Sequence, residues 1–313
     1  MANAMNTLAG VLNLGDANVD FEVSNLLQDT PVLMALEAVA SSHGHTHKFL
    51  RETVAASAGF RSINAGLTNA ASQDELVTET LKFLDASWED DVAIAKAMSS
   101  GSGGVDAYVN RRLEKSLKAA FVGIEKQIIY GDQAPGSTGG FTGLIDGIDS
   151  GMIVDAGGTT ADVQTSVYAF RTSPTDAAIV YNGDNNGTVE VDEVRKDSAV
   201  DGSGDKYSTY RQDVDGYLGF QLGNIYTVGR IANLNDATDS KPLTDDLIAE
   251  LLSLFPAGKG PNFLAMNRQS VKQLQQSRTA TNATGAPAPF PTEAFGVPII
   301  VTDQIIDTEG VVS

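Results

Sequence analysis

VDAYVNRRLEKSLKAAFVGIEKQIIY, residues 105–130, is the stretch that decides the fold. Its apolar side chains recur every three or four residues, which is the period of an amphipathic helix; they are Val105, Val109, Leu113, Leu117, Phe121, Ile124 and Ile128. The opposite face is charged and carries Arg111, Arg112, Glu114, Lys115, Lys118, Glu125 and Lys126. At 1.5 Å per residue the helix is about 39 Å long, roughly twice an ordinary globular helix. A helix of this length needs a long partner to cover its apolar face.

Glycine-rich segments mark both ends of this helix. GSGG (101–104) precedes it, and Gly131-Asp132 with Pro135-Gly136 follows it. Glycine and proline in these positions stop a helix, because glycine readily adopts the left-handed conformation and proline cannot continue the hydrogen bonding. We therefore predict one uninterrupted helix over 105–130.

Residues 46–88 carry the signals of an extended β-hairpin. KFLRETV (48–54) and ELVTETLKFLD (75–85) are β-prone, and the Gly-, Ala-, Ser- and Asn-rich stretch 55–71 between them is typical of a flexible connection. Two strands with no covering helix are marginally stable alone. We expect this hairpin to pack on something else, and a neighbouring subunit is the candidate.

Residues 1–45 have too few apolar residues for a core of their own. Thr30 and Pro31 are suited to an N-cap and a first helical position, so we predict a short helix over 31–40. The rest of this segment is expected to be an arm that stays mobile unless another surface covers it. A second short helix is predicted over 88–98, before the glycines.

Residues 151–235 are predicted to be β-rich. Segments such as SVYAFRT (166–172) and AAIVYNG (177–183) are separated by Gly, Asp and Asn turns, a spacing that indicates an antiparallel sheet. We expect the remaining residues to begin with a helix over 243–254 capped by Thr244. A strand over 262–267, a helix over 268–278 and a last strand over 297–305 are expected to follow. Helices and strands are intermixed without a regular βαβ repeat, which favours the α+β class.

The chain is acidic and contains no cysteine. Among its 313 residues, 40 are acidic and 21 basic, giving a formal net charge of -19. This balance opposes general binding to nucleic-acid phosphates and favours a solvated acidic surface. The absence of cysteine excludes disulfides, thiolate metal sites and cysteine nucleophiles. No secretory signal or membrane-length apolar run is visible, so we expect a cytosolic, soluble protein with no membrane contact.

All three histidines lie together, as His43, His45 and His47. Alternate residues of a strand point the same way, so the three imidazoles could face one zinc or copper ion. No carboxylate lies close in sequence to complete such a site. The alternative interpretation is a polar junction between the arm and the hairpin, and we predict no metal site here.

Residues 182–193 (NGDNNGTVEVDE) nearly match the calcium-binding loop of an EF-hand. Asn182, Asp184 and Asn186 fall at the first three ligand positions, and Glu193 falls at the last one. The first position lacks the expected Asp, and the flanking segments are predicted strands, whereas the motif requires helices. We therefore interpret the stretch as a β-hairpin with an Asn/Gly turn.

No catalytic constellation is present in the sequence. The glycine clusters match neither a phosphate-binding loop nor a dinucleotide fingerprint, and Gly258-Lys259 lacks the Ser or Thr of a Walker loop. Carboxylate pairs such as Asp245-Asp246 lie at predicted helix starts, where the helix dipole explains them. We predict no enzymatic activity and no cofactor.

The succession of arm, hairpin and long helix resembles the major capsid protein of tailed bacteriophages (Caudoviricetes), whose fold is named for phage Hong Kong 97. THKFLRETVAASAGFRSINAGLT (46–68) followed by VTETLKFLD (77–85) resembles the extended-loop region of that family. IEKQIIYGDQAPGSTGGFTGLID (124–146) is similar to the end of the family's spine helix and the turn after it. Residues 262–305 resemble its axial-domain pattern of strand, helix, loop and strand. Residues 151–235 are extra relative to the minimal fold.

The resemblance implies a Hong Kong 97-type α+β fold with an N-terminal arm, an extended loop, a long spine helix, and peripheral and axial domains. The implied divisions are 1–45 for the arm, 46–88 for the extended hairpin, 89–150 for the spine helix and peripheral domain, 151–235 for an inserted β-rich segment and 236–313 for the axial domain. The arm and the hairpin would lie over neighbouring subunits and gain apolar burial only upon assembly.

The implied function is structural: hexamers and pentamers of the chain would self-assemble into the icosahedral virion capsid around a double-stranded DNA genome, without sequence-specific binding. Assembly is expected in the host cytoplasm, with a portal and a possible decoration protein as partners. The arm is shorter than the fused scaffolding segment of many family members, so we expect a separate scaffolding protein.

Two other functions are compatible with the sequence. One is the shell of a cellular encapsulin-type nanocompartment, which would share the fold but enclose enzyme cargo instead of DNA. The other is a calcium- or metal-binding β-rich protein built on the asparagine-rich loop or the histidine cluster described above. Titration calorimetry with calcium and zinc distinguishes the second from a shell protein.

Overall fold

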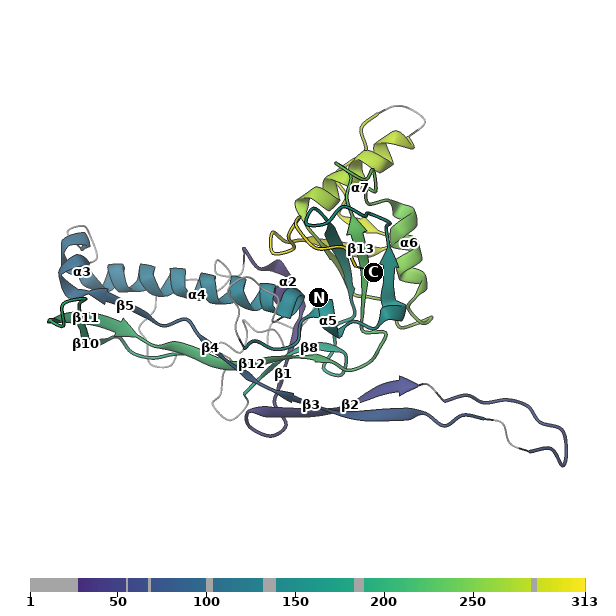
Figure 1. Ribbon diagram of the computed structural model, residues 1–313, viewed down its shortest axis with the longest axis horizontal. Helices are drawn as coiled ribbons and strands as arrows, with labels where there is room; N and C mark the ends of the chain where they lie inside the picture. Colours follow the sequence, from purple (N-terminus) through teal and green to yellow (C-terminus); the bar gives the residue numbers. More distant parts are fainter. Residues whose placement is uncertain are drawn as a thin grey trace.

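The computed structural model describes residues 28–54, 56–66, 69–99, 104–131, 139–182, 189–282 and 286–312 (Figure 1). Over these residues the molecule is elongated. A long helix lies along a sheet at one end, a second sheet covered by helices stands at the other end, and a hairpin projects beneath both. The mixture of helices and strands confirms the predicted α+β class.

The described helices are α2 (Pro31–Ala35), α3 (Val92–Met98), α4 (Gly104–Tyr130), α5 (Leu144–Gly147), the 3-10 turn η4 (Ser150–Met152), α6 (Asp245–Ser253) and α7 (Arg268–Ala280). The strands of the first half are β1 (Glu37–Ala40), β2 (Thr46–Val54), β3 (Gln73–Thr80), β4 (Lys82–Asp85), β5 (Trp88–Asp91), β6 (Ile153–Asp155), β7 (Thr165–Phe170) and β8 (Ala177–Tyr181). The later strands are β9 (Glu190–Val191), β10 (Arg195–Val200), β11 (Lys206–Gln212), β12 (Val214–Leu222), β13 (Val228–Leu234), β14 (Phe263–Met266), β15 (Glu293–Ala294) and β16 (Val297–Val301).

Helix α4 confirms the prediction made from residues 105–130. The predicted apolar stripe is buried from Val109 to Ile128, and it shares one core with Leu218 and Phe220 of β12. Gly131 follows the helix with a φ of 58°, and a Cβ added there would lie 2.2 Å from the backbone nitrogen of Gly143. Glycine at this position therefore allows both the helix end and the close return of the chain.

The sheet under α4 is the long partner that the helix requires. Its strand order is β1-β8-β12-β4, with β9 also on β12, and a smaller sheet of order β10-β11-β5 lies at the far end of the helix. Strand β12 has an inward face formed by Val214, Leu218 and Phe220, all of them buried in the shared core. The alternation of inward and outward side chains along a strand places its remaining residues on the opposite face.

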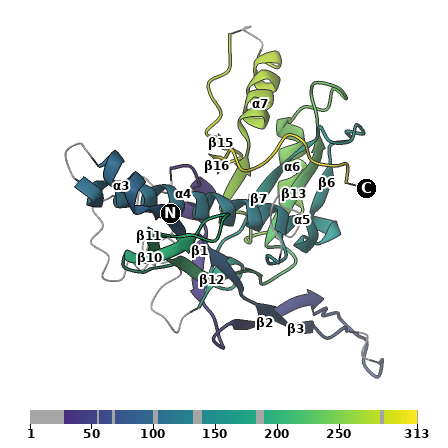
Figure 2. The same cartoon turned by 60° about the vertical axis from the view of Figure 1, so that its left-hand side comes forward.

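The second body is a six-stranded sheet of order β15-β16-β14-β7-β13-β6. Helices α6 and α7 cover one of its faces, where Val167 and Ala169 of β7 join their core (Figure 2). The alternate residues Tyr168 and Phe170 belong to the core around α4 instead. Strand β7 is thus buried on both faces, and all of its residues are buried, including Thr165 and Ser166.

Strands from 151–235 are divided between the two bodies. β6, β7 and β13 belong to the six-stranded sheet together with β14 and β16, whereas β8, β9 and β12 lie under α4. The expected boundary at residue 235 would therefore cut through one sheet. The reason is that β7 pairs antiparallel with both β13 and β14, which come from opposite sides of that boundary.

Two predicted helices are shorter than expected. The segment predicted as helix 31–40 is helical only over Pro31–Ala35, after which Glu37–Ala40 forms β1 parallel to β8. Thr30 makes no side-chain cap there. The segment predicted as helix 88–98 begins as β5, paired with β11, and becomes helical from Val92. In both places pairing with a distant strand overrides the local helical signal. Residues 1–27 of the predicted arm, and residues 101–103 and 132–138 of the predicted helix-ending segments, lie outside the described residues.

Candidate assembly surfaces

The hairpin β2–β3 presents apolar side chains to solvent. Leu50 and Leu76 are cross-strand partners on one face of the hairpin and are 65% and 61% exposed. Phe60 and Ile63, in the connection between the strands, are fully or almost fully exposed. The two predicted flanks pair as strands up to Thr80, but the end of the second flank, Lys82–Asp85, is β4 and pairs with β12 instead. The two-stranded sheet stands away from the rest of the chain (Figure 1). Exposed apolar side chains on an isolated hairpin indicate a surface that a partner covers.

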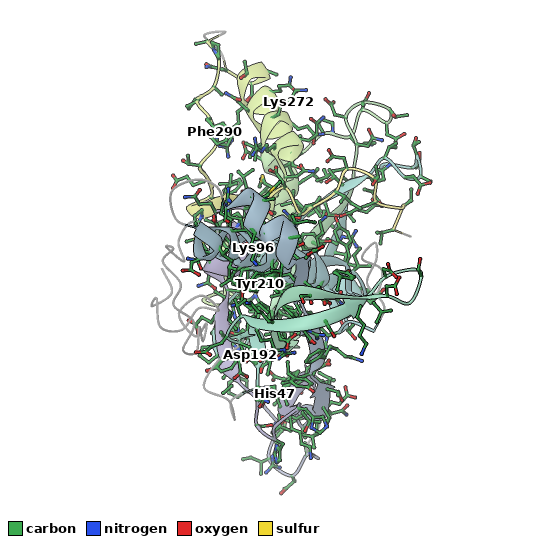
Figure 3. All side chains as sticks on the ribbon, turned by 90° about the vertical axis from the view of Figure 1, so that its left-hand side faces the viewer. His47, Lys96, Asp192, Tyr210, Lys272 and Phe290 are labelled. Atoms are coloured by element: carbon green, nitrogen blue, oxygen red, sulfur yellow. The ribbon has the colours of Figure 1, made fainter. Side chains whose placement is uncertain are left out.

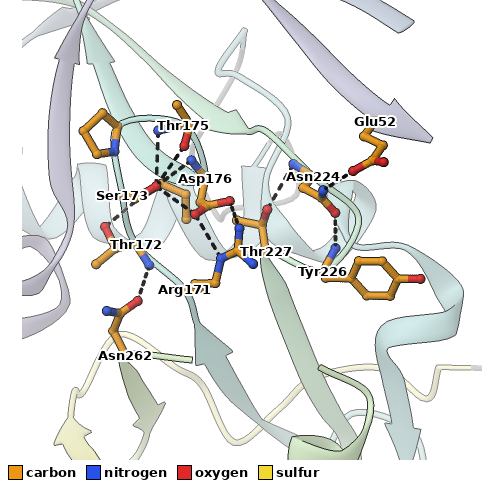
Figure 4. Close-up of polar contacts among 12 residues, drawn as sticks. Glu52, Arg171, Thr172, Ser173, Thr175, Asp176, Asn224, Tyr226, Thr227 and Asn262 are labelled. Atoms are coloured by element: carbon orange, nitrogen blue, oxygen red, sulfur yellow. Dashed lines mark hydrogen bonds and ion pairs between the residues drawn. The ribbon is translucent and has the colours of Figure 1, made fainter. Parts of the chain in front are cut away.

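The base of the hairpin is fixed to β12. Nε2 of His47 lies 2.7 Å from Oε1 of Gln221, and Nδ1 of His47 accepts the backbone N–H of Ser42 at 3.3 Å. Because Nδ1 accepts, Nε2 is the nitrogen that donates to Gln221. Further along, the side-chain amide of Asn224 donates to Glu52 at 3.2 Å (Figure 4). The hairpin is therefore held near both ends of β2, and Phe60 and Ile63 lie in the connection beyond these contacts.

A polar turn connects the two bodies beside this root (Figure 4). The guanidinium of Arg171 forms an ion pair with Asp176, and the backbone N–H of Arg171 donates to the carbonyl of Thr227 at 2.9 Å. The backbone N–H of Thr172 donates to the side-chain oxygen of Asn262 at 2.8 Å. These bonds fix the path of the chain from β7 into β8, and so from one sheet to the other.

The structure does not bring the three histidines to one point. His43 and Thr46 close a tight turn through reciprocal backbone hydrogen bonds of 3.0 Å, so His43 and His45 precede strand β2. His43 and His45 are exposed, whereas His47 is buried against Gln221. The assumption of alternate strand positions is therefore wrong for this cluster. Among the described residues no group of His, Asp or Glu side chains has the spacing of a metal site.

The calcium-loop candidate falls mostly outside the described residues. Asp184 and Asn186 lie outside them, and Asn182 and Glu193 are described. The flanking segments are strands, as predicted, but β8 and β9 do not form the predicted hairpin with each other. Both pair antiparallel with β12, at neighbouring positions along it. The hairpin interpretation is corrected, because β12 supplies the hydrogen bonds expected between the two flanks.

A buried ionic network joins the end of α4 to the six-stranded sheet. Tyr130 donates a hydrogen bond of 2.7 Å to Oε1 of Glu309. Arg230 of β13 donates to Oε2 of Glu309 and to the hydroxyl of Ser166, each at 2.9 Å. Arg230 and Glu309 are 2% and 4% exposed. Burial raises the pKa of Tyr130 above its usual range, and the Glu309 carboxylate raises it further, so the phenol remains a donor.

A second buried carboxylate joins α4 to the arm and to the end of β16. Glu125 accepts the backbone N–H of Leu33 at 3.3 Å and the hydroxyl of Thr302. Glu125 is completely buried, and burial raises its pKa to about 7 despite these hydrogen bonds. Sequence reasoning assigned Glu125 to the polar helix face, because its partner Thr302 lies 177 residues further along the chain.

Comparison with known proteins identifies the family. The model of the family described as major capsid protein GP7 matches residues 16–313 of the chain. This chain belongs to the major capsid protein GP7 family. Its role is therefore that of a structural, shell-forming component of the virion and not that of an enzyme. The recognition of a tailed-phage capsid protein from the sequence is confirmed.

One solved structure supports the same fold for this capsid protein. The bacteriophage Epsilon15 structure matches with a TM-score of 0.61 and 18% identity, over 88% of this chain and 87% of that chain. The SrpI encapsulin of Synechococcus elongatus PCC 7942 matches with a TM-score of 0.46 and 9% identity, over 71% of this chain and 94% of that one. The bacteriophage JBD30 capsid matches with a TM-score of 0.44 and 9% identity, over 86% and 88%. The last two similarities are too weak to bear on the fold or the function, and no curated protein matches the sequence.

None of the described helices of this capsid protein combines the length and the apolar character that a bilayer span requires.

Proposed function

We propose that hexamers and pentamers of this chain form an icosahedral shell around double-stranded DNA. Membership of the major capsid protein GP7 family supports the shell, and the similarity to the Epsilon15 structure supports the fold. Contacts between copies that close into rings and then into a shell would supply the symmetry. The net charge of -19 is compatible with a shell that encloses DNA without binding most of it.

The exposed apolar side chains of the β2–β3 hairpin carry this proposal. Leu50, Phe60, Ile63 and Leu76 would each contribute about 1.5–3 kcal/mol if a neighbouring copy removed them from water. Their own chain leaves them exposed. His47 and Glu52 hold β2 to β12 and to the chain after it, near the two ends of the strand, so the exposed face with Leu50 and Leu76 and the connection with Phe60 and Ile63 remain available to a neighbour.

In this proposal each part of the chain has a separate place in the shell. Residues 1–45 are the arm and 46–88 the extended loop. The β2–β3 hairpin of the loop lies over a neighbouring copy, whereas α2, β1 and β4 pack within their own chain. The body built on α4 is the peripheral domain. The six-stranded sheet with α6 and α7 is the axial domain, which meets its copies around the hexamer and pentamer centres. It takes β6, β7 and β13 from the range 151–235.

Further partners remain predictions from the family resemblance. They are a scaffolding protein that directs assembly in the host cytoplasm, a portal and a possible decoration protein.

Expression of the full chain alone, followed by sedimentation and negative-stain microscopy, tests the proposal. We expect capsomers at low protein concentration and shells of variable size at high concentration. A protein that remains monomeric at all concentrations would contradict the shell function. Uniform closed shells would support that function and count against the need for a separate scaffolding protein.

A further inference from the structure

A row of cations runs along the outward face of α4. Arg111, Lys115, Lys118 and Lys126, the cationic row, lie on the helix surface within about 80° of one another, given 3.6 residues per turn. The centre of the row is opposite the buried stripe that contacts β12. Arg111 and Lys115 are exposed, and Lys118 and Lys126 are half-buried. The row extends over about 22 Å along the helix axis.

Few carboxylates of the chain neutralise this row. Lys118 lies 3.6 Å from Glu114, one helical turn away, and both side chains are partly exposed. Such a pair contributes little and exchanges easily for another anion. Among the described residues, no ion pair involves Arg111, Lys115 or Lys126; the guanidinium of Arg111 donates only to the carbonyl of Ala107.

The sheet face turned away from α4 has the opposite charge. Asp215 lies there directly opposite Asp85 on one side and Glu190 on the other. Burial raises the pKa of Asp215, and the carboxylates of Asp192, Glu190, Asp213 and Asp85 raise it further. Figure 3 shows Asp192 and His47 on the side of the molecule opposite Lys96 of α3, the helix that precedes α4. The two faces of the body therefore differ in sign, and the hairpin root lies on the acidic side.

We propose that the cationic row of α4 lines the interior of the shell and contacts the phosphates of the enclosed duplex DNA. This inference rests on the proposed function. In a shell one subunit thick, one face of the body built on α4 is turned toward the DNA. The face formed by α4 is the one whose positive charge attracts phosphate. Duplex DNA presents one negative charge per about 1.7 Å of its axis, so a straight row of cations can engage phosphates without reading bases.

The row suits a polyanion better than a folded protein partner. Protein interfaces depend on aromatic and large apolar anchors at their centre. The residues between the cations on this face are Ala119, Val122 and Gly123, which offer no such anchor. Contacts to phosphate need only positive charge within reach, and they are weakened by salt because counterions compete.

Binding of the full chain to mixed-sequence duplex DNA over 50–200 mM salt tests the row. Four phosphate contacts predict that affinity falls roughly 150-fold over this range, whereas the variant K115Q/K118Q/K126Q, with one contact left, should lose only about 4-fold. The matched control K206Q/K259Q/K272Q changes the formal charge equally, from -19 to -22, at exposed lysines away from α4. The control should retain the full salt dependence. Equal salt dependence in the two variants would overturn the inference.

A second experiment tests whether the cationic row lies on the inner side of the shell. Formaldehyde treatment of DNA-filled particles, followed by mass spectrometry, should attach DNA to Lys115, Lys118 or Lys126 and not to Lys206. DNA attached to Lys206 but not to these three lysines would overturn the inference and leave the shell function intact. Loss of binding to polyglutamate, with unchanged binding to DNA, in the row variant would also overturn it and indicate an acidic protein as the partner. Failure to form particles at all would instead count against the proposed function.

Discussion

The hydroxyl of Tyr130, the last residue of α4, donates a 2.7 Å hydrogen bond to Glu309, which lies 179 residues further along the chain. The same hydroxyl accepts the backbone N–H of Ile306 at 2.9 Å. One phenol thus holds the C-terminal segment against the end of the long helix. Since Glu309 also pairs with Arg230 of β13, the contact sets the helix relative to the six-stranded sheet.

Tyr130→Phe should destabilise the chain by about 1–3 kcal/mol. The substitution keeps the ring but removes the hydrogen bond to Oε1 of the buried Glu309 carboxylate and leaves the Ile306 N–H without its acceptor. Oε2 of Glu309 keeps its contacts with Arg230 and Ser166. Urea unfolding measures the change. The control is Tyr217→Phe, because Tyr217 is 41% exposed and its ring packs only edge-on against Phe83. Equal losses in the two variants would contradict a special role for Tyr130.

Glu125 makes the stability of the chain depend on pH. Its pKa of about 7 in the folded state lies above the ordinary glutamate value of 4.5, so folding favours the protonated carboxyl. The stabilising contribution of this proton is complete below pH 4.5 and is lost as the pH rises through about 7. It amounts to no more than about 3 kcal/mol.

Glu125→Gln removes this dependence, because the amide stays neutral at every pH. The urea midpoint of the variant should fall less between pH 5 and pH 8 than that of the original chain. Glu114→Gln on the exposed helix surface serves as the control and should keep the original dependence. An unchanged pH profile in Glu125→Gln would show that another group is responsible.

Two glycines, one within α4 and one directly after it, should respond oppositely to alanine. Gly131→Ala places a Cβ at a φ of 58° and 2.2 Å from the nitrogen of Gly143, so we expect a loss of more than about 2 kcal/mol. Gly123→Ala meets nothing within 4 Å in the middle of α4 and should stabilise the helix by about 1 kcal/mol. Urea unfolding of both variants provides the comparison, and a stabilised Gly131→Ala protein would contradict the helix end described above.

Metal titration should give no saturable heat. The ring nitrogens of His47 are engaged by Ser42 and Gln221, and the flanks of the asparagine-rich loop are strands that pair with β12. Calorimetry with zinc and with calcium measures binding directly, and EDTA should leave the urea midpoint unchanged. Saturable calcium binding that is lost on substitution of Glu193 would restore the calcium-site hypothesis.

The sequence was sufficient where local signals decide the structure. The stripe from Val109 to Ile128 predicts α4, and Thr244 caps α6 as expected, by accepting the backbone N–H of Leu247. It was insufficient where a distant partner decides. Strand β5 exists because it pairs with β11, and the local sequence before Val92 has no sign of that partner.

The assembly surface, too, could be predicted from the sequence only in part. The lack of a covering element for the hairpin follows from the sequence of residues 46–88, and the exposure of Leu50 and Leu76 agrees with it. The anchor between His47 and Gln221 joins residues 174 positions apart, so no local pattern could predict it. The buried roles of Glu125 and Glu309 depend on similarly distant partners.

Sedimentation of the double variant Leu50→Ser/Leu76→Ser tests most directly whether neighbouring copies cover the hairpin. Its control is Lys48→Ser/Thr78→Ser, which changes a polar pair on the same hairpin face. We predict that the leucine variant remains a folded monomer under conditions in which the control and the original chain form capsomers and shells. Shells formed equally well by the leucine variant would contradict the account.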